Sequence, residues 1–84
     1  MPVTSAQVRM ARAALNWTVR DLAEATGLHR NTVTNIEVGR YTGDARSLEL
    51  IASILKKAGV EFIDENGGGP GVRLQKPQHS EQTK

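Results

Sequence analysis

The sequence predicts one mainly α-helical domain of four to five helices that ends in a C-terminal β-hairpin. Its 84 residues, of which 38% are apolar, can bury only one core. Up to residue 59 the apolar residues recur three and four positions apart, as in a helix, and over 60–74 they alternate, as in a strand. The expected organisation is a helical body over residues 1–59, a hairpin over 60–74 and a polar, disordered tail over 75–84.

Two helix starts are marked by paired capping residues, Thr4 with Gln7 and Thr18 with Asp21. In each pair the hydroxyl can accept from the backbone N–H three residues on, while the second side chain reaches back to the first residue's N–H. The first helix is expected to run to about residue 16, and the second to stop at Gly27 in a left-handed conformation. Each helix has an apolar face: Val8, Ala11 and Leu15 in the first, and Leu22 and Ala23 in the second.

Two further helices are expected over roughly 30–38 and near 45–58, each followed by a glycine. The third turns Val33 and Ile36 inward. The fourth has an inward face made of Leu48, Ile51, Ala52 and Leu55. Three more apolar residues widen that face: Leu50, Ile54 and Ala58. This surplus is either ordinary packing or a contact with a second subunit.

The segments VEFID and GVRLQ alternate in character and are separated by ENGGGPG, which predicts a hairpin with a long glycine loop. A two-stranded hairpin is marginal in water, so these strands must pack on the helices or pair with strands of another chain. The second arrangement would add the strands to a dimer interface through five apolar residues: Val60, Phe62, Ile63, Val72 and Leu74. The glycine run leads into an extended segment rather than a helix, so it is not a phosphate loop.

The composition argues against an enzyme, a metal protein and a membrane protein. There is no cysteine, and the two histidines, His29 and His79, lie far apart, so neither a nucleophile beside its base nor a metal-ligand spacing is present. No cofactor and no metal are expected. No apolar run is long enough to span a membrane, and no secretory signal is present, so we expect a cytoplasmic protein without membrane contact.

The net charge of +2 is unevenly distributed. Residues 1–59 hold eight Lys and Arg against five Asp and Glu, whereas residues 60–84 hold three against four. A mildly basic body can meet a polyanion, but the excess is too small to decide the matter. The position of individual side chains has to decide it.

Residues 18–40 combine two short helices, a tight turn at Gly27 and a polar outer face. Ala23 and Gly27 follow Val19 at intervals of four, which places a small residue where the helices cross and a glycine where the chain turns. The outer face of the second helix consists of His29, Arg30, Asn31, Thr32, Thr34 and Asn35. Any exposed helix is polar, but Asn and Thr are poor helix formers, so their use here lowers the stability of the helix. A binding role would explain why they are used. Arg, Asn and Thr suit the edges of bases in the major groove.

The same residues resemble the helix-turn-helix repressors of the xenobiotic-response-element (XRE) type, also called the phage repressor and Cro type. That family's core reads W-S-Q-x-x-L-A-x-x-x-G-[VL]-S-x-x-T-[IV]-x-x-[IF]-E-x-G. The matching residues are Trp17, Thr18, Leu22, Ala23, Gly27, Leu28, Thr32, Val33, Ile36, Glu37 and Gly39. The resemblance covers residues 5–58, extends to about residue 74, and implies a lambda-repressor-like helix-turn-helix bundle.

The resemblance implies base-reading roles for Arg30, Asn31 and Asn35, with Thr32 and Thr34 as secondary candidates. Phosphate contacts are implied at the start of the second helix and on both flanks of the third: Thr18, Val19, Arg20, His29, Arg40, Tyr41 and Thr42.

Two departures from the family pattern stand out. Val19 occupies the place of a glutamine, so the contact of that side chain is not carried over, and His29 replaces the serine that caps the recognition helix. Glu37 and Trp17 are expected to be structural, the first near the helix end and the second as a core anchor.

The predicted function is that of a sequence-specific DNA-binding transcriptional regulator, a repressor that acts as a homodimer on a palindromic operator. One such module contacts only a few base pairs, and two-fold pairing doubles the contacts. The alternative is an antitoxin-like or adaptor protein that binds a partner protein and autoregulates through the same helix-turn-helix. The expected partners are double-stranded DNA, a second copy of the chain and, in the alternative, another protein.

Overall fold

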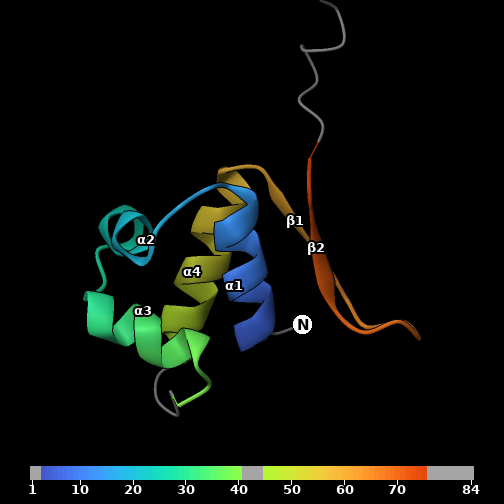
Figure 1. Cartoon of the computed structure of the whole chain (residues 1–84), viewed down its shortest axis with the longest axis horizontal. Helices are drawn as coiled ribbons and strands as arrows, with labels where there is room; N and C mark the ends of the chain where they lie inside the picture. The colour runs from blue at the N-terminus through green and yellow to red at the C-terminus, as the bar shows by residue number, and fades with distance from the viewer. Residues whose placement is uncertain (1–2, 41–44, 76–84) are drawn as a thin grey trace, which may run out of the picture.

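In the computed structural model, which describes residues 3–40 and 45–75, helices are followed by a two-stranded sheet. The elements are α1 (Ser5–Ala14), α2 (Val19–Thr26), α3 (Arg30–Glu37), α4 (Ala45–Lys57), β1 (Val60–Ile63) and β2 (Gly71–Leu74). Figure 1 shows α2 and α3 on one side of α1 and α4, with the hairpin on the other side. The predicted mainly α fold with a C-terminal hairpin is confirmed, with four helices in the described residues. The predicted disorder of the tail beyond residue 75 concerns residues outside the described ranges.

The starts of α1 and α2 form as the capping pairs predict. Thr4 Oγ1 accepts a hydrogen bond from the Gln7 N–H at 3.1 Å, and Gln7 Oε1 accepts one from the Thr4 N–H at 2.9 Å. Thr18 and Asp21 form the same reciprocal pair at 3.0 and 2.9 Å. The end of α1 comes slightly earlier than predicted, because Asn16 takes a φ of 60°, which a right-handed helix cannot continue through.

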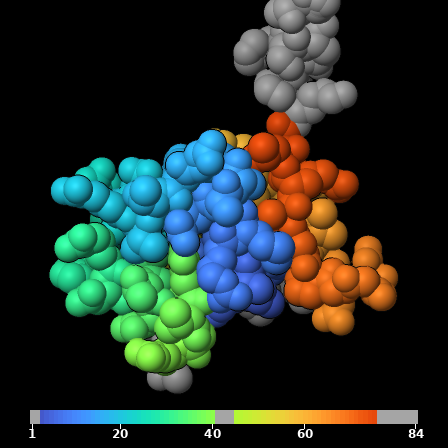
Figure 2. Space-filling view, in the orientation of Figure 1, coloured from blue at the N-terminus to red at the C-terminus, as the bar shows by residue number. Residues whose placement is uncertain are grey.

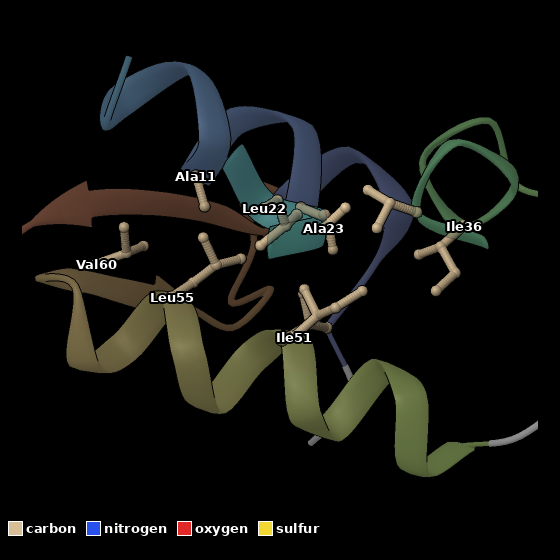
Figure 3. Close-up of a cluster of buried hydrophobic side chains, with 10 residues drawn as sticks. Ala11, Leu22, Ala23, Ile36, Ile51, Leu55 and Val60 are labelled. Atoms are coloured by element: carbon tan, nitrogen blue, oxygen red, sulfur yellow. The ribbon is translucent and has the colours of Figure 1, made fainter. Parts of the chain in front are cut away.

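A cluster of buried apolar side chains lies between the helices and the hairpin (Figure 3). Its members come from the segment before α1, from every helix and from β1: Val3, Val8, Ala11, Leu22, Ala23, Val33, Ile36, Ile51, Leu55 and Val60. Trp17 packs against this cluster, as expected of a core anchor. The hairpin is therefore packed into the same core as the helices.

The two strands pair antiparallel, with Val60 opposite Leu74 and Ile63 opposite Gly71. Gln7 holds the hairpin to α1, because its Nε2 atom donates to the backbone oxygens of Ile63 at 3.1 Å and of Gly71 at 2.9 Å. The strands thus pack on helices of their own chain, which is one of the two arrangements open from the sequence.

Val60 was expected at a dimer interface, and the structure corrects this. Its exposed fraction is 0%, and its side chain belongs to the core cluster beside Leu55 (Figure 3). The inner face of the hairpin also carries Phe62 and Val72, which pack partly against the core, whereas Leu74 stays 53% exposed. The alternating pattern was interpreted correctly as a strand, but the apolar face of this strand packs on the helices of the same chain.

Candidate nucleic-acid interface

The turn between α2 and α3 is fixed by local hydrogen bonds. Gly27 takes a φ of 79° and donates its N–H to the Ala23 oxygen at 2.8 Å, which ends α2 in the left-handed conformation predicted from the glycine. The Thr26 hydroxyl donates to the Leu22 oxygen at 2.9 Å and accepts from the Leu28 N–H at 3.2 Å. The two helices therefore meet at one defined geometry.

The helix α3 has a buried face and an open face. Val33 and Ile36 lie in the core cluster, as predicted, and Glu37 is buried beside them. Four of the five predicted base-reading residues are exposed: Arg30, Asn31, Thr34 and Asn35. Thr32 is half-buried, so it offers less surface than the others. Figure 2 shows α3 and α2 next to each other on the surface of the molecule, away from the hairpin.

The first turn of α3 is capped by His29. Its Nδ1 atom accepts a hydrogen bond from the Asn31 N–H at 3.0 Å, while its backbone stays extended. The imidazole thus caps the helix in place of the family's serine. Because Nδ1 accepts this hydrogen bond, the proton of a neutral ring would lie on Nε2. His29 is exposed at the edge of the open face, where a phosphate contact was predicted.

The end of α3 holds Arg40 in a defined position. Gly39 takes a φ of 80° and donates its N–H to the Ile36 oxygen at 3.1 Å, and the Arg40 N–H donates to the Asn35 oxygen at 2.9 Å. These two bonds make a Schellman motif, which satisfies the last carbonyl groups of the helix. Arg40 therefore leaves the helix next to the open face with its side chain exposed. The other two phosphate candidates of this loop, Tyr41 and Thr42, lie outside the described residues.

The start of α2 supplies the remaining phosphate candidates. The side chain and N–H of Thr18 are already paired with Asp21, so Thr18 has little left to offer a phosphate. Val19 packs partly against the core and can contribute only its backbone N–H, one of the first-turn amides without a helical acceptor. The side chain of Arg20 is 74% exposed and lies 3.7 Å from Glu24, close enough for a weak ion pair that leaves the guanidinium accessible.

The helix α1 fixes the position of α3 through a buried ion pair that the sequence did not predict. Arg12 Nε and Nη2 donate to the two carboxylate oxygens of Glu37 at 2.7 and 3.0 Å, and Arg12 Nη1 donates to the Trp17 oxygen at 2.9 Å. Arg9 Nη1 donates to the backbone oxygen of Glu37. The hydrogen bonds to Glu37 raise the pKa of Arg12, partial burial works against this, and the negative charge of Glu37 adds to it.

The sequence carried one signal for this pair. Glu37 follows Val33 by four residues and so falls on the buried face of α3, where a carboxylate requires a cationic partner. Glu37 was predicted to be structural. Which arginine of α1, Arg9 or Arg12, forms the ion pair with it could be decided only from the fold.

The candidates for a dimer interface differ in exposure. On α4, Leu50 is 39% exposed, whereas Ile54 and Ala58 are half-buried. On the hairpin, Phe62, Ile63 and Val72 are half-buried and Leu74 is exposed.

Within residues 3–40 and 45–75, His, Cys, Asp and Glu side chains form no group of three or more that could hold a metal ion. None of the helices in these ranges has the length and apolar character needed to cross a bilayer.

These features define a helix-turn-helix unit, in which a polar second helix is presented by a first helix and a tight turn. A family model described as helix-turn-helix matches residues 8–62 of the chain. The protein belongs to this family of XRE-type helix-turn-helix regulators, which bind DNA and regulate transcription. No curated protein matches the chain.

Proposed function

We propose that this protein is a repressor that reads operator DNA with the open face of α3 and binds as a homodimer. The observation that carries the proposal is the side-chain content of that face, which presents Arg30, Asn31, Thr34 and Asn35 to solvent from a helix held at both ends. Arginine can form two hydrogen bonds with guanine and asparagine two with adenine. Such pairs discriminate between bases, whereas contacts from Arg20 and Arg40 to phosphates would fix the register.

Base reading is tested by selecting bound sites from random DNA with the intact protein, then measuring affinity for the selected site. Arg30→Ala and Asn35→Ala are each expected to lose preference for that site over unrelated DNA, by roughly 1 to 3 kcal/mol per lost base contact. Lys57→Ala is the control, since Lys57 is exposed at the end of α4. Equal affinity of wild type and Arg30→Ala for the selected site would falsify the base-reading assignment.

A homodimer is proposed because one α3 reads only a few base pairs, and a two-fold pair on a palindromic site reads twice as many. The hairpin is the favoured contact surface. Within the described residues β2 pairs only with β1, so its second edge has no strand partner there, and Leu74 at the end of β2 is 53% exposed. The Leu50 side of α4 is the second candidate.

The two surfaces are distinguished by sedimentation velocity of Leu74→Glu and Leu50→Glu. A charge at the true interface should convert dimer to monomer, and the other variant should remain a dimer. If a different polypeptide co-purifies with wild type and is lost with Leu74→Glu, the hairpin serves a partner protein, as in an antitoxin or adaptor.

The sign of regulation is proposed from the resemblance to phage repressors. A reporter gene placed behind the selected site should be expressed more strongly with Arg30→Ala than with wild type. Weaker expression with that variant would make the protein an activator.

A further inference from the structure

Val38 is an exposed apolar residue at the end of the recognition helix. Among the large apolar side chains of the described residues it has the largest exposed fraction, 54%. It does not belong to the core cluster or to the side chains that pack against it. The fold therefore leaves about half of the surface of Val38, the C-cap residue of α3, open to water.

Val38 lies on the face of α3 that carries the proposed base-reading residues. Its N–H donates to the Thr34 oxygen at 3.0 Å, so it sits one helical turn beyond Thr34. Asn31 and Asn35 precede it by seven and three residues, which places all of them on one stripe of the helix surface. The Schellman motif that follows holds the chain on the C-terminal side of Val38.

The open face of α3 gains apolar groups toward its C-terminal end. Its N-terminal part carries the guanidinium of Arg30 and the amide of Asn31, which form hydrogen bonds. Its C-terminal part carries the amide of Asn35 and, beside it, the methyl group of Thr34 and, one turn further, the two methyl groups of Val38. Val38 has no donor or acceptor in its side chain, so it can contact neither a phosphate oxygen nor a base edge by hydrogen bonding.

We propose that Val38, together with the methyl group of Thr34, reads thymine in each operator half-site. Thymine alone among the DNA bases places a methyl group, at C5, in the major groove, and apolar side chains recognise it by contact. The inference rests on the proposed function, because it requires α3 to enter the major groove. It assigns a base preference to the C-terminal end of α3, beyond the residues that carry hydrogen-bonding groups.

The test removes the methyl group from either partner. Each thymine of one half-site of the selected operator is replaced in turn by deoxyuridine, which differs only in lacking the C5 methyl group. At one position wild type should lose about fourfold in affinity, the effect of withdrawing one methyl-sized group from apolar contact. Val38→Ala should bind thymine DNA about 16-fold more weakly, because both subunits of the dimer lose a contact of this size. It should lose almost nothing further with deoxyuridine at that position.

Two further variants serve as controls for the combined Val38→Ala and deoxyuridine experiment. Met10→Ala removes an exposed apolar side chain from α1 and should keep the full response to deoxyuridine. Thr34→Ser removes the neighbouring methyl group but keeps the hydroxyl, so it should show a partial response. Thermal unfolding of each variant checks that the fold is retained.

The inference is overturned if wild type binds every deoxyuridine site as tightly as the thymine site, or if Val38→Ala responds to deoxyuridine as strongly as wild type. Neither result would affect the proposed function, which stands on the selected site itself. If selection yields no preferred sequence, the proposed function fails and the reading of thymine fails with it.

Discussion

At the scale of single residues, Glu37 helps to fix the position of α3 against α1, although it lies on the buried face of the helix and reads no base. Its carboxylate is buried and takes two hydrogen bonds from Arg12. Glu37→Gln should therefore cost about 1 to 3 kcal/mol of unfolding free energy, because it leaves the partly buried Arg12 without a counter-charge. Urea denaturation measures this loss.

The control for this prediction is a second bidentate pair, which lies on the hairpin. Glu61 and Arg73 face each other across the hairpin at 3.1 Å, but both side chains are roughly half exposed or more. Glu61→Gln should cost far less than Glu37→Gln, since an exposed pair is screened by water. If both variants lose equally, burial is not what makes the Arg12–Glu37 pair stabilising.

His29 offers a prediction of the opposite sign. Its imidazole caps α3 by accepting from the Asn31 N–H, but Ser is among the preferred residues at this position. His29→Ser should stabilise the domain by about 0.5 kcal/mol and raise the Tm by about 2 to 4 °C. A lower Tm would mean that the imidazole contributes packing that the hydroxyl cannot replace. Circular dichroism during heating decides between these results.

At the scale of elements, one side chain joins three of them. Gln7 completes the cap of α1 with its oxygen and holds both strands with its nitrogen. Gln7→Met keeps the length of the side chain but removes the donor, and should cost about 1 to 2 kcal/mol. Hydrogen exchange of the hairpin amides should speed up. Thr4→Ala weakens the same cap without touching the strands, so it should leave their exchange unchanged; faster exchange there would contradict this division of roles.

The elements that the sequence predicted are those set by neighbours along the chain. The caps at Thr4 and Thr18, the stop at Gly27 and the two faces of α3 all depend on residues three or four apart, and each is found in the structure. The links between elements were not predicted. Arg12 finds Glu37 across 25 residues, and Gln7 reaches Gly71 across 64. No periodic pattern states which donor meets which acceptor over such separations.

The same limit explains the error at Val60. An alternating strand has one apolar face whether it packs on its own helices or on a second subunit, so the pattern alone cannot choose between them. The structure decides for Val60, which is buried at 0% exposure, and leaves Leu74 with an open surface. Of the candidate site, the sequence predicted the residues of the open face, while the buried pair that positions them needed the fold.

At the scale of the whole molecule, the two proposed contacts use opposite sides. The helices α2 and α3 lie on one side of α1 and α4, and the hairpin lies on the other (Figure 1). A second copy bound at the hairpin would therefore leave both recognition helices uncovered. Dimer formation and DNA binding should support each other, because a dimer holds two reading faces at a fixed spacing.

This arrangement predicts how binding responds to salt. Arg40 is exposed and its backbone is fixed by the bond from its N–H to the Asn35 oxygen, but it lies beyond the helix that reads bases. Each phosphate contact contributes about 0.9 to the slope of log K against log salt concentration. Arg40→Ala in a dimer should therefore flatten the slope by about 1.8 and weaken selected and unrelated DNA alike. Lys57→Ala, which removes a charge at the end of α4, should leave the slope unchanged. A loss confined to the selected site would instead make Arg40 a base-reading residue.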